Sequence, residues 1–545
     1  MIDTTKNGMI ETIIENMTLD DMCGQLLCYL VPDGPDSSAF SDFEEALKRT
    51  KPGGLFVRSL LTGEKRKMVT ELANKYAPVP VIIAGDTEFG PNTIQKECPH
   101  LLPNQMAWGS CNDEKLVERG GKVTAQICRK SGIHWSFAPV VDINYNKDNP
   151  VTNTRAVSDS PEHVVKIAGA YLKGLQSEGH MAAACKHFPG DGMDDRNQHF
   201  CTSVNSMSKE EWMNTYGYVY KELFKLNPAS IMIGHISAPA LQDEEEYDEV
   251  AGYLPGTLSK SLMTKLLREE LGFDGCIVSD ALGMVGVAAV IPQAKLPVEF
   301  INAGGDMLLF AEPSYFDCIK NAVLDGTIPM DRLKDAVRRI LRLKEFVGLI
   351  GDERPEVEIT EDIEAVATEI AEKSIKIVRD ADNILPLSLN KGDSVLLCSQ
   401  FFKESNADKF EHIEKELNRR GIKTIHLKNP KHREIEQILD EEKPACVLIN
   451  CSFSISDSSG GTLRMGWNSC STFWRGLVLH RHPKVVFTSF GDPYKLYELP
   501  FLRTYVNTFS DTEESQKAFV RVLLGEIEAK GKNPVALKGF FEREV

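Results

Sequence analysis

Several kinds of sequence signal are missing from this 545-residue chain. No stretch approaches the roughly 20 consecutive apolar residues that a membrane-spanning helix needs, which argues against a membrane protein. No C-x-x-C pair and no G-x-G-x-x-G or P-loop motif occurs, which argues against zinc sites and the common nucleotide-binding folds. The opening sequence MIDTTKNGMIETIIENMT has no basic segment followed by an apolar core, so we expect a cytoplasmic protein without a secretory signal.

A surplus of positive charge is also missing. The formal net charge is −17, which argues against nucleic acid or an anionic membrane as a partner, since both attract cationic surfaces. The 13 cysteines are an odd number and many lie in apolar runs, as expected of reduced thiols. With 42% hydrophobic and 26% charged residues, the composition is that of a soluble globular protein, and the length requires more than one core.

The first 350 residues alternate short apolar runs with longer amphipathic segments. The runs are nearly continuous in apolar character, as parallel strands covered on both faces should be. We expect helices between them at 112–130, 160–179 and 259–271. This alternation predicts an α/β fold with a (β/α)8 TIM-like barrel at 1–350. The eight runs are GQLLCYL from Gly24, GGLFVR from Gly53, VPVIIAGD from Val79, IHWSFAPVVD from Ile133, MAAACKHF from Met181, SIMIGH from Ser230, GCIVSD from Gly275 and GGDMLLF from Gly304.

A second, smaller α/β block follows the barrel. Residues 351–380 are predicted to form a linker and a first helix, and 381–545 a layered-sheet (sandwich) domain. Helical patterns at 408–420 and 515–525 separate its strands. The predicted strands are DSVLLCS from Asp393, ACVLINC from Ala445, KVVFTSF from Lys484 and TYVNTFS from Thr504.

Polar residues stand where the apolar runs of the barrel end. Barrel enzymes work at the C-terminal ends of their strands, so side chains at these positions are expected to converge on one site. The fifth run is followed by a Phe-Pro-Gly-Asp-Gly turn and a polar loop. The strand-end candidates are Asp86, Asp142, Lys186, His187, His235 and Asp280, and the loop adds Asp194, Asp195, Asn197 and His199.

Two of these residues suit glycoside cleavage, which needs a carboxylate nucleophile and a proton donor. Asp280 lies among small residues, which allows a sugar ring to approach closely. His199 suits the proton donor because its ordinary pKa is near neutrality. A general acid usually has an orienting partner, and Asn197, Asp194 and Asp195 are the candidates in its own loop.

Four strings resemble glycoside hydrolase family 3, in chain order FAPVVDIN…NPVTNTR, KHFPGDG, MIGHISAPAL and GFDGCIVSDALGM. They look most like its two-domain β-N-acetylglucosaminidase (β-N-acetylhexosaminidase) branch. The resemblance implies that Asp280 forms the glycosyl-enzyme and that His199 is the acid/base. It further implies that the pair Lys186 and His187 holds sugar hydroxyls, with Asp86 on the distal hydroxyls and Arg155 on the sugar. No metal or organic cofactor is implied.

The chain departs from the family pattern around the acid/base. The family's Asp-Ser-His becomes Asn197-Gln198-His199, and the histidine of its K-H-F-P-G-H-G turn becomes Asp191. An amide can orient an imidazole but cannot stabilise its cation by charge. Asp194 or Asp195 could supply the missing charge.

The sequence therefore predicts an exo-acting retaining β-glycosidase for terminal β-N-acetylhexosamine in oligosaccharides or cell-wall fragments. Three alternatives stay open: a β-glucosidase with its acid carboxylate in the second domain, a phosphorylase that accepts phosphate, and a sugar-binding barrel without turnover. The segment 458–477, with Arg464 and Trp467, could reach the barrel mouth. The expected partner is a small glycoside, with no nucleic acid or membrane, and the protein is a monomer or homodimer.

Overall fold

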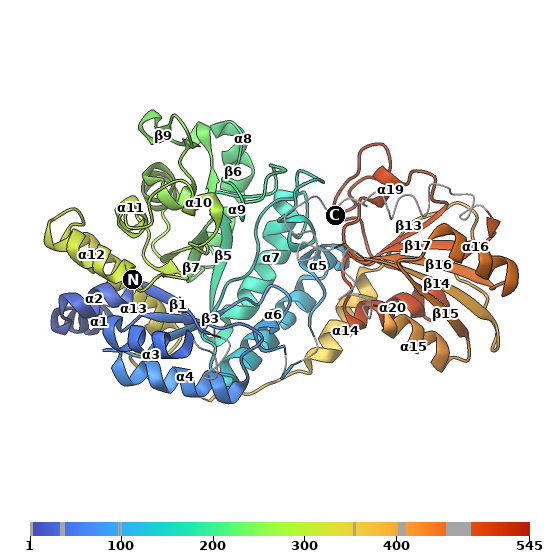
Figure 1. The fold of residues 1–545 in the computed structure, drawn as a ribbon, viewed down its shortest axis with the longest axis horizontal. Helices are drawn as coiled ribbons and strands as arrows, with labels where there is room; N and C mark the ends of the chain where they lie inside the picture. The colour runs from blue at the N-terminus through green and yellow to red at the C-terminus, as the bar shows by residue number, and fades with distance from the viewer. Residues whose placement is uncertain are drawn as a thin grey trace. The chain divides into compact units, whose positions relative to one another are not determined.

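The computed structural model describes residues 4–32, 39–95, 97–98, 101–179, 181–352, 356–401, 410–453 and 481–545 (Figure 1). They form two compact units that alternate along the chain. The barrel unit contains Met1–Leu101, Glu118–Ile143 and Ala168–Asp362. The sandwich unit contains Leu102–Val117, Asn144–Ile167 and Ile363–Val545. The predicted boundary at 350 precedes the last of these transitions, which lies between Asp362 and Ile363.

All eight apolar runs of the barrel region form strands, which confirms the predicted fold class. Their order in the sheet is β11-β7-β5-β4-β3-β2-β1-β12, and all seven pairings are parallel. A parallel bridge between Val278 and Met307 joins the two outermost strands and closes the barrel. The strands are β1 (Leu27–Leu30), β2 (Gly54–Phe56), β3 (Ile82–Gly85), β4 (Trp135–Ser136), β5 (Ala182–Phe188), β7 (Ser230–Ile233), β11 (Cys276–Ser279) and β12 (Leu308–Leu309).

Helices alternate with these strands, so that both faces of each strand are covered and apolar side chains are needed throughout. The three helices predicted at 112–130, 160–179 and 259–271 are present as α6, α7 and η7, each a few residues shorter than expected. Apart from 3-10 helices of three residues each, the helical elements described up to the last barrel helix are α1 (Thr4–Asn16), α2 (Leu19–Gln25), α3 (Ala39–Thr50), α4 (Gly63–Tyr76), α5 (Gln105–Cys111), α6 (Glu114–Lys130), α7 (Pro161–Gln176), α8 (Lys209–Asn214), α9 (Tyr216–Phe224), η7 (Ser261–Glu270), α10 (Val285–Ala288), α11 (Leu296–Ala303), α12 (Tyr315–Leu324) and α13 (Met330–Phe346).

Two short pairs of strands lie in the loops of the barrel unit. The first pairs β6 (Ser203–Val204) with β8 (Ile236–Ser237) in parallel, which joins the loop after β5 to the loop after β7. The second is an antiparallel hairpin of β9 (Tyr247–Asp248) and β10 (Gly252–Tyr253). The first pair brings the predicted acid/base loop beside the end of β7.

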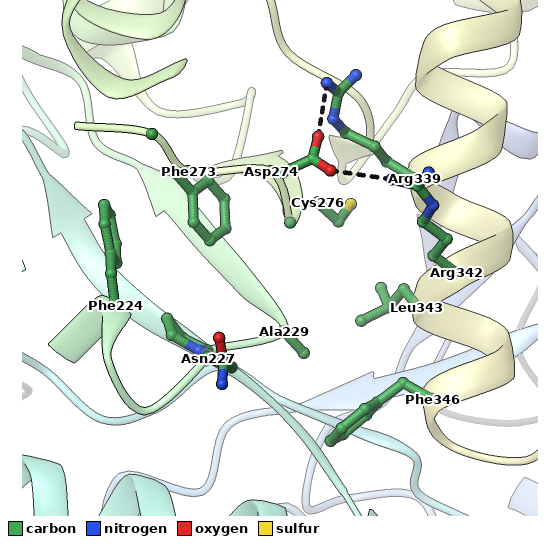
Figure 2. A pocket seen from close by; sticks show the side chains of 13 residues that line it. Phe224, Asn227, Ala229, Phe273, Asp274, Cys276, Arg339, Arg342, Leu343 and Phe346 are labelled. Atoms are coloured by element: carbon green, nitrogen blue, oxygen red, sulfur yellow. Dashed lines mark hydrogen bonds and ion pairs between the residues drawn. The ribbon is translucent and has the colours of Figure 1, made fainter. Parts of the chain in front are cut away.

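The N-terminal ends of β7 and β11 border a pocket of about 350 Å³ (Figure 2). Phe224 and Phe273 stack on one side of it at 5.1 Å between ring centroids. Arg339 and Arg342 of α13 both bind the Asp274 carboxylate, at 3.1 and 3.0 Å, as the dashed lines in Figure 2 show. The charges that line this pocket are therefore paired with one another.

Two further charged groups are buried at the same end of the barrel. Asp306 has no exposed surface and binds Arg268 at 2.6 Å and Arg332 at 2.7 Å. The equally buried Lys344 donates from Nζ to Gln25 Oε1 at 2.7 Å. Burial lowers the pKa of Lys344 to about 7.

The sandwich unit contains a six-stranded sheet in the order β13-β18-β17-β16-β14-β15. The four predicted strands form its centre, and both edge strands were missed by the sequence. Edge strands carry polar, partly exposed residues, so no apolar run marks them. The strands are β13 (Lys376–Asp380), β14 (Ser394–Gln400), β15 (Lys423–Lys428), β16 (Cys446–Cys451), β17 (Val485–Ser489) and β18 (Thr504–Asn507).

Helices cover both faces of this sheet. One apolar core includes Ile413 and Phe519 from α15 and α20, and the other includes Ile435 and Leu496 from α16 and α19. Among the pairings described for this sheet, only β13–β18 is antiparallel. This layered arrangement confirms the predicted second domain type. The remaining helices are α14 (Ile363–Ser374), α15 (Glu411–Arg419), α16 (His432–Glu441), α19 (Lys495–Glu498) and α20 (Glu513–Leu523). None of the helices described in either unit is both long and apolar enough to cross a bilayer.

Candidate active site

Most of the predicted strand-end residues meet at the C-terminal ends of the barrel strands. Asp86 directly follows β3, Lys186 and His187 lie near the end of β5, and Asp280 directly follows β11. The segment that carries Asp142 runs beside β5, where Val141 N–H donates to Lys186 O at 2.7 Å. Parallel strands of a barrel end at the same rim, so their terminal side chains share one opening.

Asp280 is held in place by backbone hydrogen bonds. Its own N–H donates to Ile233 O at 2.8 Å, and the N–H of Ala281 donates to its Oδ1 at 2.7 Å. Burial raises the pKa of Asp280, but the neighbouring His187 and His235 and the Ala281 N–H lower it, with a net result below the ordinary value. The carboxylate is therefore ionised at neutral pH, as a nucleophile requires.

His187 is fixed by Asp142. His187 Nδ1 donates to Asp142 Oδ2 at 2.7 Å, and the His187 backbone N–H donates to Asp142 Oδ1 at 3.1 Å. Since the fully buried carboxylate can only accept, Nδ1 carries a hydrogen and Nε2 faces the site. His187 Nε2 lies 4.0 Å from Asp280 Oδ2. This separation is too long for a direct hydrogen bond and leaves both atoms able to contact one sugar ring.

Lys186 is shared between two carboxylates of the loop after β3. Its Nζ lies 3.1 Å from Asp86 Oδ1 and 2.6 Å from Glu88 Oε1. Glu88 is buried, while the Asp86 side chain is 43% exposed and can still accept hydrogen bonds from a ligand. Glu88 was missed by the sequence analysis, although its place two residues after Asp86 was a usable signal.

His235 follows β7 and is fully buried. Its Nε2 lies 3.0 Å from Ala281 O and its Nδ1 lies 2.7 Å from Thr257 Oγ1. A carbonyl can only accept, so Nε2 carries the hydrogen and Nδ1 accepts from the Thr257 hydroxyl. Burial lowers the pKa of His235, which keeps this ring neutral near pH 7. His235 therefore holds Ala281, the residue that follows Asp280.

His199 is exposed on the loop after β5 and contacts Asn197. Asn197 Oδ1 accepts the His199 backbone N–H at 3.0 Å and lies 2.7 Å from His199 Nδ1. The backbone donor identifies this amide atom as oxygen, so His199 Nδ1 must also carry a hydrogen. Proton exchange with a ligand is thereby assigned to Nε2.

The two aspartates proposed as partners of His199 have other surroundings. Asp194 accepts from Arg196 Nε at 2.7 Å and from the Val204 N–H at 2.8 Å, and Asp195 is exposed. Asn197 is the candidate partner for which the structure gives a bond to the imidazole. A role for either aspartate in proton transfer stays a prediction.

For three other predicted residues, a position at this rim stays a prediction. Arg155 belongs to the sandwich unit, where its Nη1 donates to Val151 O at 3.1 Å, and its contact with the sugar stays a prediction. Arg464 and Trp467, with the segment 458–477, lie outside the described residues.

The rim and the loop after β5 thus present an ionised aspartate, an exposed histidine and a set of fixed donors and acceptors. This arrangement is suited to attack at a sugar carbon with protonation of the leaving group. The described residues contain no group of three or more His, Cys, Asp or Glu side chains positioned to bind a metal.

Comparisons with known proteins agree with this chemistry. Residues 18–343 match the model of the glycosyl hydrolase family 3 N terminal domain. A β-N-acetylglucosaminidase/β-glucosidase of Cellulomonas fimi is 31% identical over 554 residues, which covers 98% of this chain and 96% of that protein. A β-glucoside phosphorylase structure has a TM-score of 0.85 at 28% identity and covers 97% of this chain and 96% of that chain.

A further solved structure supports the fold. The family 3 β-N-acetylglucosaminidase of Paenibacillus sp. str. FPU-7 has a TM-score of 0.80 at 23% identity, over 97% of this chain and 100% of that chain. The family match spans more than half of the sequence, and the two-unit architecture is shared along nearly all of it. The chain therefore belongs to glycosyl hydrolase family 3 and is a glycosidase.

Proposed function

We propose that this protein is an exo-acting, retaining β-glycosidase that removes terminal β-linked N-acetylhexosamine, chiefly N-acetylglucosamine, from oligosaccharides or cell-wall fragments. The observation that carries the proposal is the ionised Asp280 beside a fixed His187 Nε2, at 4.0 Å. The substrate class is supported by the Cellulomonas fimi relative, which is named as a β-N-acetylglucosaminidase/β-glucosidase.

In the first step, an Asp280 oxygen attacks the anomeric carbon and the bond to the leaving group breaks. His199 Nε2 gives its proton to the departing oxygen, while Asn197 Oδ1 holds Nδ1–H. The products of this step are a glycosyl ester on Asp280 and the free aglycone. In the second step, His199 takes a proton from water as the water oxygen attacks the same carbon and releases the carboxylate.

The sugar hydroxyls are bound by the neighbouring fixed groups. Lys186 Nζ donates, Asp86 accepts with its exposed oxygen atoms, and His187 Nε2 lies close to the nucleophile. Because Lys186 is already paired with Asp86 and Glu88, its ammonium is fixed before the sugar arrives. Groups positioned in advance require less ordering when the substrate binds.

A second candidate is phosphorolysis, and the His199–Asn197 contact favours it. A neutral amide occupies the position at which the family pattern has a carboxylate, so an anionic acceptor meets less repulsion beside His199. The β-glucoside phosphorylase among the similar structures supports this candidate. Phosphate in place of water would attack the glycosyl-Asp280 ester and give a sugar 1-phosphate.

The test is cleavage of p-nitrophenyl β-N-acetylglucosaminide beside the β-glucoside, with and without inorganic phosphate. The enzymes compared are the wild type, Asp280→Asn and His199→Ala. Cleavage of the acetamido substrate that is lost in both variants supports the lead proposal. Stimulation by phosphate with formation of a sugar 1-phosphate selects the second candidate. Cleavage of the glucoside alone, unaffected by His199→Ala, rejects both the sugar and the acid/base assignment.

A further inference from the structure

Gln198 is the residue between Asn197 and His199, and its side chain is almost fully buried at 1% exposure. The exposed His199 and the buried Gln198 thus lie next to each other in the acid/base loop. A buried amide needs hydrogen-bond partners, and its choice of partners shows what the loop is attached to.

The Gln198 side chain bridges the segments that follow β5 and β7. Its Oε1 accepts the backbone N–H of His235 at 2.9 Å, and its Nε2 faces Asp191 Oδ2 at 3.4 Å, a long hydrogen bond. The His235 N–H can only donate and the Asp191 carboxylate can only accept, so both neighbours require the same orientation of the amide.

Each partner is connected to a functional group. The Asp191 N–H donates to Asp142 Oδ1 at 2.8 Å, and this carboxylate also holds His187. The His235 ring binds Ala281 O at 3.0 Å, and the N–H of Ala281 binds Asp280. Gln198 is therefore linked through two residues to His187 and through two others to Asp280.

The backbone of the same loop is attached to the segment after the nucleophile. Val285 N–H donates to His199 O at 3.1 Å, and Gly286 N–H donates to Gln198 O at 3.2 Å. A Cβ on Gly286 would lie 2.5 Å from Gln198 O and 3.0 Å from Cys201 O, so only glycine permits this approach.

We propose that Gln198 is a positioning residue that fixes His199 relative to Asp280. This inference rests on the proposed function in one respect, that His199 is the acid/base. The buried amide anchors the loop while the next residue stays exposed, so the separation of acid and nucleophile is set before substrate binds. Both Gln198 and Asp191 differ from the Ser and His of the family pattern, and in this chain the two side chains face each other.

The chain offers a matched control at the opposite end of the same two strands. Gln176 Oε1 accepts the N–H of Ala229 at 2.8 Å and of Ala183 at 3.4 Å, and its Nε2 donates to Asn227 O at 3.0 Å. These bonds join the beginnings of β5 and β7, whereas those of Gln198 join the segments after their ends. Gln176→Leu removes equivalent bonds without touching the site.

The experiment measures kcat and KM of Gln198→Leu and Gln176→Leu on two glycosides of the same sugar. One carries a poor leaving group that needs protonation and the other carries dinitrophenolate, which does not. We expect Gln198→Leu to lower kcat/KM about 10²-fold on the first and much less on the second. Gln176→Leu should keep wild-type kinetics on both.

A second variant keeps the test open if Gln198→Leu does not fold. Gln198→Glu retains the acceptor for His235 but places a carboxylate against that of Asp191, and protonation of the new side chain restores a donor. Its activity relative to wild type should therefore rise as the pH falls. The inference is overturned if both leaving groups are affected equally, if Gln198→Leu matches Gln176→Leu, or if Gln198→Glu shows the wild-type pH profile.

Failure of the proposed function would look different. If His199→Ala retains its rate on the poor leaving group, the acid/base assignment is wrong. If His199→Ala collapses and Gln198→Leu does not, the assignment stands and the positioning role alone is rejected. The ratio kcat/KM reports only the steps up to leaving-group departure, which precedes the choice of water or phosphate, so this ratio does not depend on the acceptor.

Discussion

The carboxylates at the two ends of the barrel strands have different kinds of partners. At the N-terminal end, Asp306 is bound by Arg268 and Arg332, and Asp274 is bound by the two arginines shown in Figure 2. At the C-terminal end, Asp280 is bound by one backbone N–H and faces His187 only at 4.0 Å. Asp306 and Asp274 at the first end are paired with arginines, and Asp280 at the second keeps capacity for a ligand.

This difference shows how a barrel separates stability from chemistry. A buried ion pair whose partners all lie within the fold stabilises the folded state while it is intact. Removing one partner strongly lowers the free energy of unfolding. A charge positioned for a reaction is stabilised just enough to stay ionised. Substitutions at the two ends should therefore change different measured quantities, and four predictions test this.

The largest expected effect is that of Asp280→Asn on catalysis. An amide cannot form the glycosyl ester, so kcat should fall by about 10³-fold or more. The free energy of unfolding should stay within about 0.5 kcal/mol of the wild type, as for substitutions away from stabilising features. Steady-state kinetics and urea denaturation measure the two quantities. A large loss of stability here would contradict the comparison.

Asp306→Asn is the converse change at the other end. Removing one charge leaves Arg268 and Arg332 buried without their carboxylate, which should lower the free energy of unfolding by about 3–5 kcal/mol. The folded fraction should keep the wild-type kcat. Denaturant titration and active-site-normalised rates test this, and a selective loss of kcat would show that the two ends are coupled.

Lys344→Met should change how stability depends on pH. The folded pKa of Lys344 is about 7, below its ordinary 10.5, so the unfolded chain binds more protons between these values. The free energy of unfolding therefore rises with pH from 7 upward, by up to about 1.4 kcal/mol per pH unit from this group. Urea titrations from pH 7 to 8.5 should show a steeper rise in the wild type than in the variant.

The urea titrations end at pH 8.5 because, above this pH, the buried cysteines make the free energy of unfolding fall as the pH rises. Burial raises the pKa of Cys185 and Cys398 to about 12, so thiols ionise in the unfolded chain first. If the free energy of unfolding rises equally with pH in wild type and in Lys344→Met, the amine of Lys344 is paired or hydrated in solution.

The smallest effect is expected for Asp274→Asn. This carboxylate is 70% exposed, so its two ion pairs are screened by solvent and should contribute about 1 kcal/mol or less. The melting temperature at low and high salt measures the change. A loss as large as that of Asp306→Asn would mean that exposure does not separate the two classes of ion pair at this end.

The barrel was predictable because each of its strands carries a local apolar signal. β13 and β15 were not, because as edge strands they lack that signal. In the site, the strand-end positions of Asp280 and His187 indicated a shared rim without any three-dimensional information. The role of Gln198 could not be predicted, because its partners Asp191 and His235 are brought together only by the pairing of β5 with β7.

The alternation of the two units along the chain has a consequence for engineering and inheritance. The chain passes between the units after Leu101, Val117, Ile143, Ile167 and Asp362. A cut at any single position therefore cannot separate the two units with both intact, and exchanging the sandwich with that of a relative would require three segments to be moved together. For recombination, the catalytic barrel and its companion are one module.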